Sequence, residues 1–148
     1  MKVIIAIDAT PNTEWVARAA ARRQWPARTE LRLVVVVESP PYAQPPHRRY
    51  VKGKSYYLSQ AEYDALETAV RKIAASIGTE GKKVSFVIRE GLADDEIITE
   101  AKEWGADLIM VGTHGRRRFS RFLLGSVAQR VVATAPCSVE VVRQKQTQ

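Results

Sequence analysis

The sequence has little of what cross-links a chain or anchors it in a membrane. It contains one cysteine in 148 residues, so no disulfide can form within the chain. No apolar run approaches the roughly 20 residues of a membrane-spanning helix. The apolar run Val3 to Ile7 is too short for the core of a signal peptide and ends at the charged Asp8. We therefore expect a cytoplasmic protein with no membrane segment.

Several catalytic signatures are also missing. No glycine-rich loop precedes a Lys-Ser or Lys-Thr pair, which excludes a P-loop ATPase. The motifs contain no nucleophile beside a base and no pair of catalytic carboxylates. His114 has no His, Cys or carboxylate at metal-ligand spacing, so we expect no zinc site. These absences predict a binding protein with no catalytic and no metal-ligating residues to name.

What is present is the pattern of one α/β domain over residues 1–148. The 45% hydrophobic content is enough for a core without staples, and the lone Cys137 is expected to be a small buried hydrophobe. Apolar, often β-branched runs alternate with helical periodicity. Five strands are expected, at Lys2 to Ile7, Leu31 to Val37, Lys83 to Ile88, Ala106 to Val111 and Ser138 to Val142. This alternation predicts a single-domain, doubly wound, five-stranded parallel sheet of the Rossmann-like class, with helices on both faces.

The helices between these strands have recognisable starts and faces. Thr10 as N-cap with Pro11 predicts a helix that runs to Trp25, and Ser59 with Glu62 forms a capping box that starts the longest helix. That helix is expected to turn Ala65, Ala69, Ile73 and Ile77 toward the sheet. The next apolar spacing comprises Ile97, Ile98, Ala101 and Trp104, and it ends at Gly105.

The segment Gly112 to Ser126 predicts a phosphate cradle. Its glycines follow an apolar strand, where they allow backbone N–H groups to approach an anion. Gly125-Ser126 then opens the apolar periodic run Val127, Val131, Val132 and Ala135, so a helix N-terminus with free donors points at the same place. Ser126 would cap that helix or bind a phosphate oxygen.

Two further groups should reach the same edge of the sheet. Asp8 ends the first strand and Val36 or Val37 ends the second, so a carboxylate and strand-end backbone would face the ligand crevice. Two interpretations of Asp8 stay open, a ligand contact and a partner for the dipole of the following helix. The valines are core residues in either case, with only their backbone available for function.

With these residues in view, the sequence resembles the universal stress protein family. The resemblance rests on Gly112, two residues, Gly115, nine residues and Gly125-Ser126. It extends over nearly the whole chain, through the strand ending in Asp8, the Gly91 turn before Asp94-Asp95-Glu96-Ile97, the Ala106-Asp107-Leu108-Ile109 strand and Ala135-Pro136-Cys137. The family has ATP-binding members that keep this glycine pattern and members that lack it. This chain looks like the first kind.

The resemblance implies an adenine nucleotide alpha hydrolase-like fold that binds ATP with a divalent cation, Mg or Mn. The adenine would lie against the backbone near Val36, with Asp8 toward the nucleoside. The implied nucleotide-binding residues are Asp8, Val36, Val111, Gly112, His114, Gly115, Arg116, Gly125, Ser126 and Val127. Related ATP-binding sequences can have a hydroxyl side chain at the position of Ala128. The alanine would lack that phosphate contact, which bears on the affinity for ATP.

Two basic segments have more than one interpretation. Arg116, Arg117, Arg118 and Arg121 lie between the two halves of the cradle, where they either attract phosphates or are solvated. His114 either donates to a phosphate or packs on the helix. The proline-rich stretch Glu38 to Tyr57 is either a hinged cover over the nucleotide or a disordered loop.

The function that the resemblance implies is an ATP-dependent stress-response and signalling module. The alternatives are slow ATP hydrolysis, with Asp8 orienting water, and nucleic-acid binding, which the net charge of +7 raises but no motif supports. Ser138 to Val142 should be an edge strand, and the resemblance implies a homodimer through it. The sequence does not name a further protein partner.

Overall fold

The computed structural model describes residues 1–8, 14–38, 55, 57–78, 81–113 and 124–144. The described strands form one sheet in the order β3-β2-β1-β4-β5, and every neighbouring pair is parallel. They are β1 (Lys2–Ile7), β2 (Glu30–Glu38), β3 (Lys83–Gly91), β4 (Leu108–Gly112) and β5 (Ser138–Val142). The predicted five-stranded parallel sheet is confirmed, with β2 and β3 longer and β4 shorter than expected.

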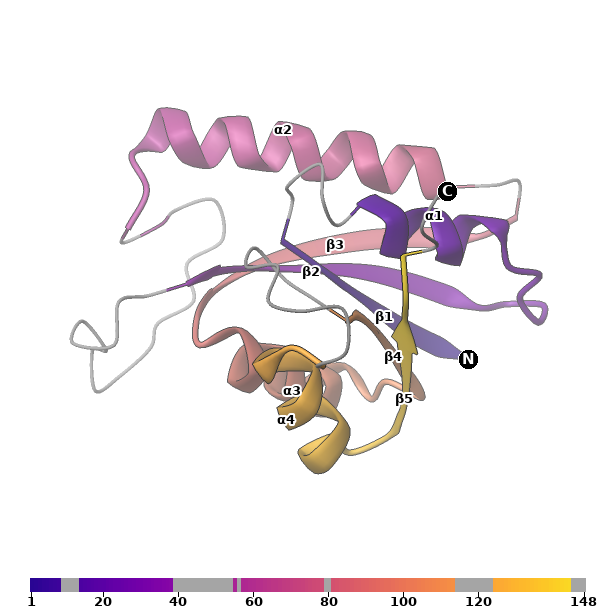
Figure 1. Cartoon of the computed structure of the whole chain (residues 1–148). Coiled ribbons are helices and arrows are strands. Elements are labelled where there is room, and N and C mark those ends of the chain that lie inside the picture. The colour runs from indigo at the N-terminus through magenta and orange to yellow at the C-terminus, as the bar shows by residue number, and fades with distance from the viewer. Residues whose placement is uncertain (9–13, 39–54, 56, 79–80, 114–123, 145–148) are drawn as a thin grey trace.

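The helices lie in two layers, one on each face of the sheet (Figure 1). They are α1 (Glu14–Arg22), α2 (Gln60–Ile77), α3 (Ala93–Trp104) and α4 (Ser126–Thr134). α1 and α2 contact each other on one face, and α3 and α4 contact each other on the other. This is the doubly wound arrangement that the alternating pattern predicts.

The alternation of side chains along β1 divides the core in two. Val3, Ile5 and Ile7 pack with α1 and α2, whereas Ile4 and Ala6 pack with α3 and α4. A strand buried on both faces reads as a continuous apolar run because neither face meets water. The run Lys2–Ile7 was therefore predicted with the bounds that the structure shows.

The longest helix starts as predicted, and its predicted stripe faces the sheet only in part. In the capping box, the Glu62 amide donates to Ser59 Oγ at 3.2 Å and the Ser59 amide donates to Glu62 Oε2 at 2.7 Å. The buried residues of α2 are Tyr63, Val70, Ala74 and Ile77. Of the predicted stripe only Ile77 is buried, and Ala65 is exposed. Ile73 is half-buried and packs against the same core, so the prediction holds for the second half of the helix and fails at Ala65.

Two other expected boundaries also change. α1 ends at Arg22 and not at Trp25, because the chain turns back and the Trp25 indole Nε1 donates to the Ala20 carbonyl at 2.9 Å. The proposed start of this helix at Thr10 and Pro11 lies outside the described residues. α3 ends as predicted, with Gly105 in the left-handed conformation at φ 69°.

The face under α3 carries a layer of charge that the sequence did not reveal. Arg89 on β3 pairs with Glu96 at 2.8 Å and Glu100 at 2.6 Å, and Arg32 on β2 pairs with Glu100 at 2.7 Å. Both glutamates are about 95% buried, at 5% and 4% exposed. The arginines compensate for the hydration that the buried carboxylates lose, so ion pairs lie among the apolar contacts on the α3 side of the sheet.

Candidate functional site

The crevice of the sheet lies where the strand order reverses. β1 continues to β2 on one side and neighbours β4 on the other, so the carboxyl ends of β1 and β4 flank the switch point. Asp8 follows β1 directly, and Gly112 ends β4. The structure therefore brings these two predicted residues to adjacent strand ends.

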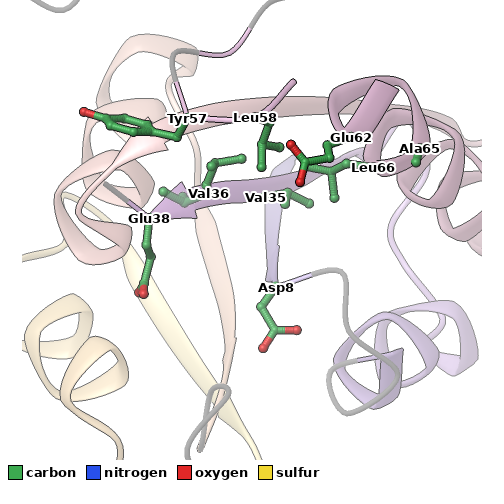
Figure 2. A pocket seen from close by; sticks show the side chains of 10 residues that line it. Asp8, Val35, Val36, Glu38, Tyr57, Leu58, Glu62, Ala65 and Leu66 are labelled. Atoms are coloured by element: carbon green, nitrogen blue, oxygen red, sulfur yellow. The ribbon is translucent and has the colours of Figure 1, made fainter. Parts of the chain in front are cut away.

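The end of β2 borders a pocket of about 580 Å³. Figure 2 shows Asp8 on one side of this strand end and Leu58, Glu62 and Leu66 on the other. Its volume is in the range of small-molecule sites, roughly 300–1,000 Å³. The lining residues are Asp8, Val35, Val36, Val37, Glu38, Tyr57, Leu58, Glu62, Ala65 and Leu66.

Beyond Val35, the backbone of β2 lies beside the pocket and has no described pairing with β1. The described pairing between β1 and β2 ends with Ile7 opposite Val35, whereas β2 stays paired with β3 as far as Glu38. On the side of β1, the strand therefore extends past its partner and presents backbone groups to the pocket. Val36 is buried and Val37 is half-buried, which confirms both as core residues. Both valines line the pocket. Whether a bound base would lie against the backbone of Val36 or of Val37 therefore stays a prediction.

Among the described lining residues, the charges are of one sign. Asp8, Glu38 and Glu62 are carboxylates, and the other described lining residues are apolar except for the Tyr57 hydroxyl. Asp8 is half-buried with its Oδ2 atom inside the protein. Hydrogen bonds from the Ser59 backbone and side chain hold the pKa of Glu62 below its usual value. Such a pocket suits hydroxyl and amino donors of a ligand and disfavours phosphate groups.

At the other end of the crevice, Gly112 has a packing role that the sequence did not show. A Cβ atom on Gly112 would lie 2.9 Å from Trp15 Cζ2 and 3.0 Å from its Cη2. Any side chain would collide with the ring that α1 lays over the end of β4. The predicted glycine is therefore required here by the indole of Trp15, whether or not an anion approaches.

The backbone around the cradle is partly engaged within the chain. The Thr113 amide donates to the Val142 carbonyl at 3.1 Å, and the Gly125 amide donates to the Thr113 carbonyl at 2.7 Å. The Gly125 amide is therefore engaged within the chain, and the predicted contact of Gly125 with a phosphate stays a prediction. Gly125 is the N-cap of α4, so Ser126 is the first helical residue and does not cap the helix as one of its predicted roles required.

The backbone amides that remain to bind an anion at this edge of the sheet are therefore those of the first turn of α4. The opening amides of a helix lack partners within it. Ser126 is exposed, and Val127 packs partly against the α3/α4 core. Val111 and Ala128 are buried in that core, and the predicted contact of Val111 with a nucleotide stays a prediction. Val132, which the sequence placed in the same apolar run, is 51% exposed.

Several predicted residues lie outside the described residues. His114, Gly115 and Arg116 belong to the undescribed range 114–123, as do the other loop arginines. Most of the stretch Glu38 to Tyr57 is also undescribed, with Glu38, Ser55 and Tyr57 as the exceptions. The contacts predicted for these residues stay predictions.

Other chemistry is limited in the part of the chain that the structure describes. It contains no group of three or more His, Cys, Asp or Glu residues that could hold a metal ion. It also has no helix long and apolar enough to cross a membrane. Cys137 is half-buried and not fully buried as expected, and burial, with the charge of Asp107 second, raises the pKa of its thiol.

Sequence reasoning missed the wall of the pocket that α2 provides. Tyr57, Leu58 and Glu62 line it from the segment that precedes α2 and from its first turn. The capping box was recognised, but nothing in its spacing says that the helix begins beside the end of β2. That neighbourhood depends on how α2 crosses the sheet.

The comparisons with known proteins agree with this fold. The model of the universal stress protein family matches residues 1–143. A universal stress protein of Methanocaldococcus jannaschii is 30% identical over 142 residues, which cover 96% of this chain and 81% of that protein.

Solved structures of similar fold include proteins from a bacterium and a plant. UspA from Lactobacillus plantarum has a TM-score of 0.68 at 21% identity, with 97% of each chain covered. A universal stress protein family protein from Arabidopsis thaliana, solved with AMP bound, has a TM-score of 0.57 at 21% identity, covering 98% of this chain and 92% of that one. On the match of the family model to residues 1–143, this chain belongs to the universal stress protein family.

Proposed function

We propose that this protein binds an adenine nucleotide at the carboxyl edge of its sheet. The observation that carries the proposal is the pocket where β2 extends past β1, with Asp8 beside it. The base and ribose would occupy this acidic, apolar-walled pocket, and the phosphates would lie toward the first turn of α4. The AMP bound by the Arabidopsis thaliana relative supports an adenine nucleotide as the ligand class.

The distance between the two ends suits such a ligand. β2 and β4 lie on either side of β1, so their ends are separated by two strand spacings, roughly 10 Å. Base and phosphates of one nucleotide are separated on the same scale. The carboxylates at the β2 end and the helix amides at the β4 end also set the direction, because phosphates are repelled by the first and attracted by the second.

Within this class we propose ATP, with Mg or Mn, as the ligand. A divalent cation would be held by the phosphate oxygens of the nucleotide. It would neutralise the phosphate charge. Asp8 would accept hydrogen bonds from the ribose hydroxyls, because it is only half-buried and lines the pocket.

The test is a calorimetric titration of nucleotide-free protein with ATP and magnesium, and separately with AMP and adenosine. Micromolar binding is expected for ATP, and Asp8→Asn is expected to weaken all three ligands roughly tenfold, because a hydrogen bond to a charged group is lost. Glu67→Gln is the matched control, since this carboxylate on α2 pairs with Arg71 and does not line the pocket. Absence of binding to the wild-type protein would refute the proposal.

We further propose that the nucleotide acts as a cytoplasmic switch in a stress response, because the chain lacks recognisable catalytic machinery. Binding would change the exchange of backbone amides in the segments that adjoin the two ends of the site. Hydrogen exchange with and without ATP measures this for Glu38 to Tyr57 and for Gly112 to Leu124. Identical exchange in both states would exclude the switch and leave simple binding.

The switch is proposed to act in a homodimer joined through β5. This strand lies at the edge of the sheet, as predicted, and its residues are only partly buried. An edge strand offers backbone groups on its open side for pairing with a second copy. Light scattering at micromolar concentration is expected to give twice the chain mass, and a monomeric mass would contradict this part of the proposal.

A further inference from the structure

One side chain outside the predicted motifs ties the wall of the pocket to the sheet. Ser55 Oγ donates to Glu90 Oε1 near the end of β3. The same oxygen accepts from the Tyr57 amide at 3.1 Å and from the Leu58 amide at 2.9 Å. A serine hydroxyl has one donor and two acceptor positions, so all three are used. We call this arrangement of Ser55 and Glu90 the serine latch.

The latch lies next to the residues that shape the pocket. Tyr57 and Leu58 both line it, and the capping box of α2 begins at the next residue, Ser59. Glu90 is the register partner of Val37, which lines the pocket from β2. The Ser55 hydroxyl thus connects Tyr57 and Leu58, which form one wall of the pocket, to β3, the neighbour of β2.

The bond to Glu90 goes beyond what a turn requires. Serine commonly accepts amides two or three residues ahead, and this alone bends the chain before a helix. A purely local turn would be satisfied by those two acceptor contacts. Here the donor position of Ser55 reaches a carboxylate 35 residues away, and a hydrogen bond to a charged group is about twice as strong as a neutral one.

We propose that Ser55 is a positioning residue for the nucleotide, holding Tyr57 and Leu58 at the distance from β2 that the base and ribose require. The inference rests on the proposed function, because it assigns the latch to the same pocket. It acts only on the nucleoside end. Adenosine and ATP should therefore lose the same factor in affinity when the latch is removed.

The experiment compares four variants by calorimetry with adenosine and with ATP and magnesium, at a temperature where thermal unfolding shows each to be folded. Ser55→Ala is expected to weaken both ligands roughly tenfold. Ser55→Thr keeps the hydroxyl and should restore affinity, and Glu90→Ala should reproduce the loss. Ser76→Ala is the control, since Ser76 on the exposed side of α2 bonds only the Ile73 carbonyl among the contacts recorded for it, at 2.7 Å.

Hydrogen exchange of the Tyr57 and Leu58 amides provides a second readout that needs no ligand. Both amides should exchange faster in Ser55→Ala and in Glu90→Ala than in the wild-type protein. Unchanged exchange in both variants would overturn the latch. Faster exchange with unchanged affinity for both ligands, or a loss that Ser55→Thr does not restore, would overturn the positioning role.

The two proposals fail in different ways. A wild-type protein that binds neither ligand refutes the proposed function and, with it, the positioning role, while the exchange data still report whether the latch exists. A wild-type protein that binds and a Ser55→Ala variant that binds equally well refute only the inference.

Discussion

The nucleoside end and the phosphate end of the proposed site are built in different ways. At the nucleoside end, side chains from β1, β2 and α2 form a pocket that contains three carboxylates. At the phosphate end the groups are backbone amides and glycines within one short stretch, Gly112 to Ser126, in a segment without acidic residues. In the proposed site, the first end would select a ligand by shape and hydrogen bonding, and the second by charge and by room for the backbone.

Gly112 offers the strongest test of this contrast, because Trp15 occupies the space that a side chain on Gly112 would need. Gly112→Ala is expected to destabilise the protein by about 1–3 kcal/mol through overpacking. Adding Trp15→Phe removes the two ring atoms in collision and should recover much of the stability, as measured by urea unfolding. Gly78→Ala is the control, since the nearest atom to a Cβ there lies at 3.5 Å.

The double variant also separates packing from anion binding. If it is stable and binds ATP as the wild-type protein does, Gly112 serves packing alone. If it is stable and has lost affinity for ATP but not for adenosine, the glycine is needed by the phosphates as well.

The first turn of α4 should respond next most strongly. Ser126→Pro removes an amide donor at the first helical position, where proline is tolerated, and the preceding Gly125 already has the extended ψ of 154° that proline requires. Affinity for ATP is expected to fall roughly tenfold, with adenosine unaffected. Ser126→Ala removes only the hydroxyl and is the matched control. An equal loss for adenosine and ATP would show that the two ends are not distinct.

Substitution of Gln129 should have a smaller effect, because its side chain supports the phosphate end and is not one of the proposed phosphate-binding groups. Its Nε2 donates to the Leu124 carbonyl at 2.6 Å. Gln129→Met keeps the size and loses the bond, which is expected to cost about 0.5–1 kcal/mol of stability in urea. Gln60→Met is matched to it, because Gln60 bonds Asp64 within one turn of α2. Equal costs would mean that Gln129 has no special role in holding Leu124.

The smallest expected effect is the pH dependence of stability that Glu62 contributes at the nucleoside end. The pKa of Glu62 is lowered in the folded protein by its bonds with Ser59, so its contribution to stability is present above the ordinary glutamate pKa. That contribution is lost as pH falls through the lowered value. Melting temperatures should therefore fall more steeply with acid in the wild-type protein than in Glu62→Gln, which keeps an acceptor but cannot titrate. Parallel curves would contradict this assignment.

The difference between the ends also explains which parts of the site were predictable. Gly112, Gly125 and Ser126 are close in sequence, and strand, loop and helix follow each other directly, so their spacing carries the signal. Asp8 was predicted because a parallel sheet brings all carboxyl ends to one edge. Leu58, Glu62 and Leu66 were missed, because they reach the pocket only through the crossing of α2 over the sheet.

Misplaced side chains have the same origin. Ala65 and Val132 fit an apolar period, yet both are exposed, because the rotation of each helix places Tyr63 and Val131 inward instead. The arginines and glutamates under α3 gave no sequence signal. They are far apart along the chain and meet only when β2, β3 and α3 pack together.

The sequence by itself determined the order and kind of the elements, because the periods of strands and helices and the capping residues act over a few residues. It also determined the family. The tertiary structure decided which faces are buried, why Gly112 has no side chain, which amides are engaged, and that Ser55 meets Glu90. These depend on contacts between segments distant in the chain, and such contacts are fixed by packing and not by local spacing.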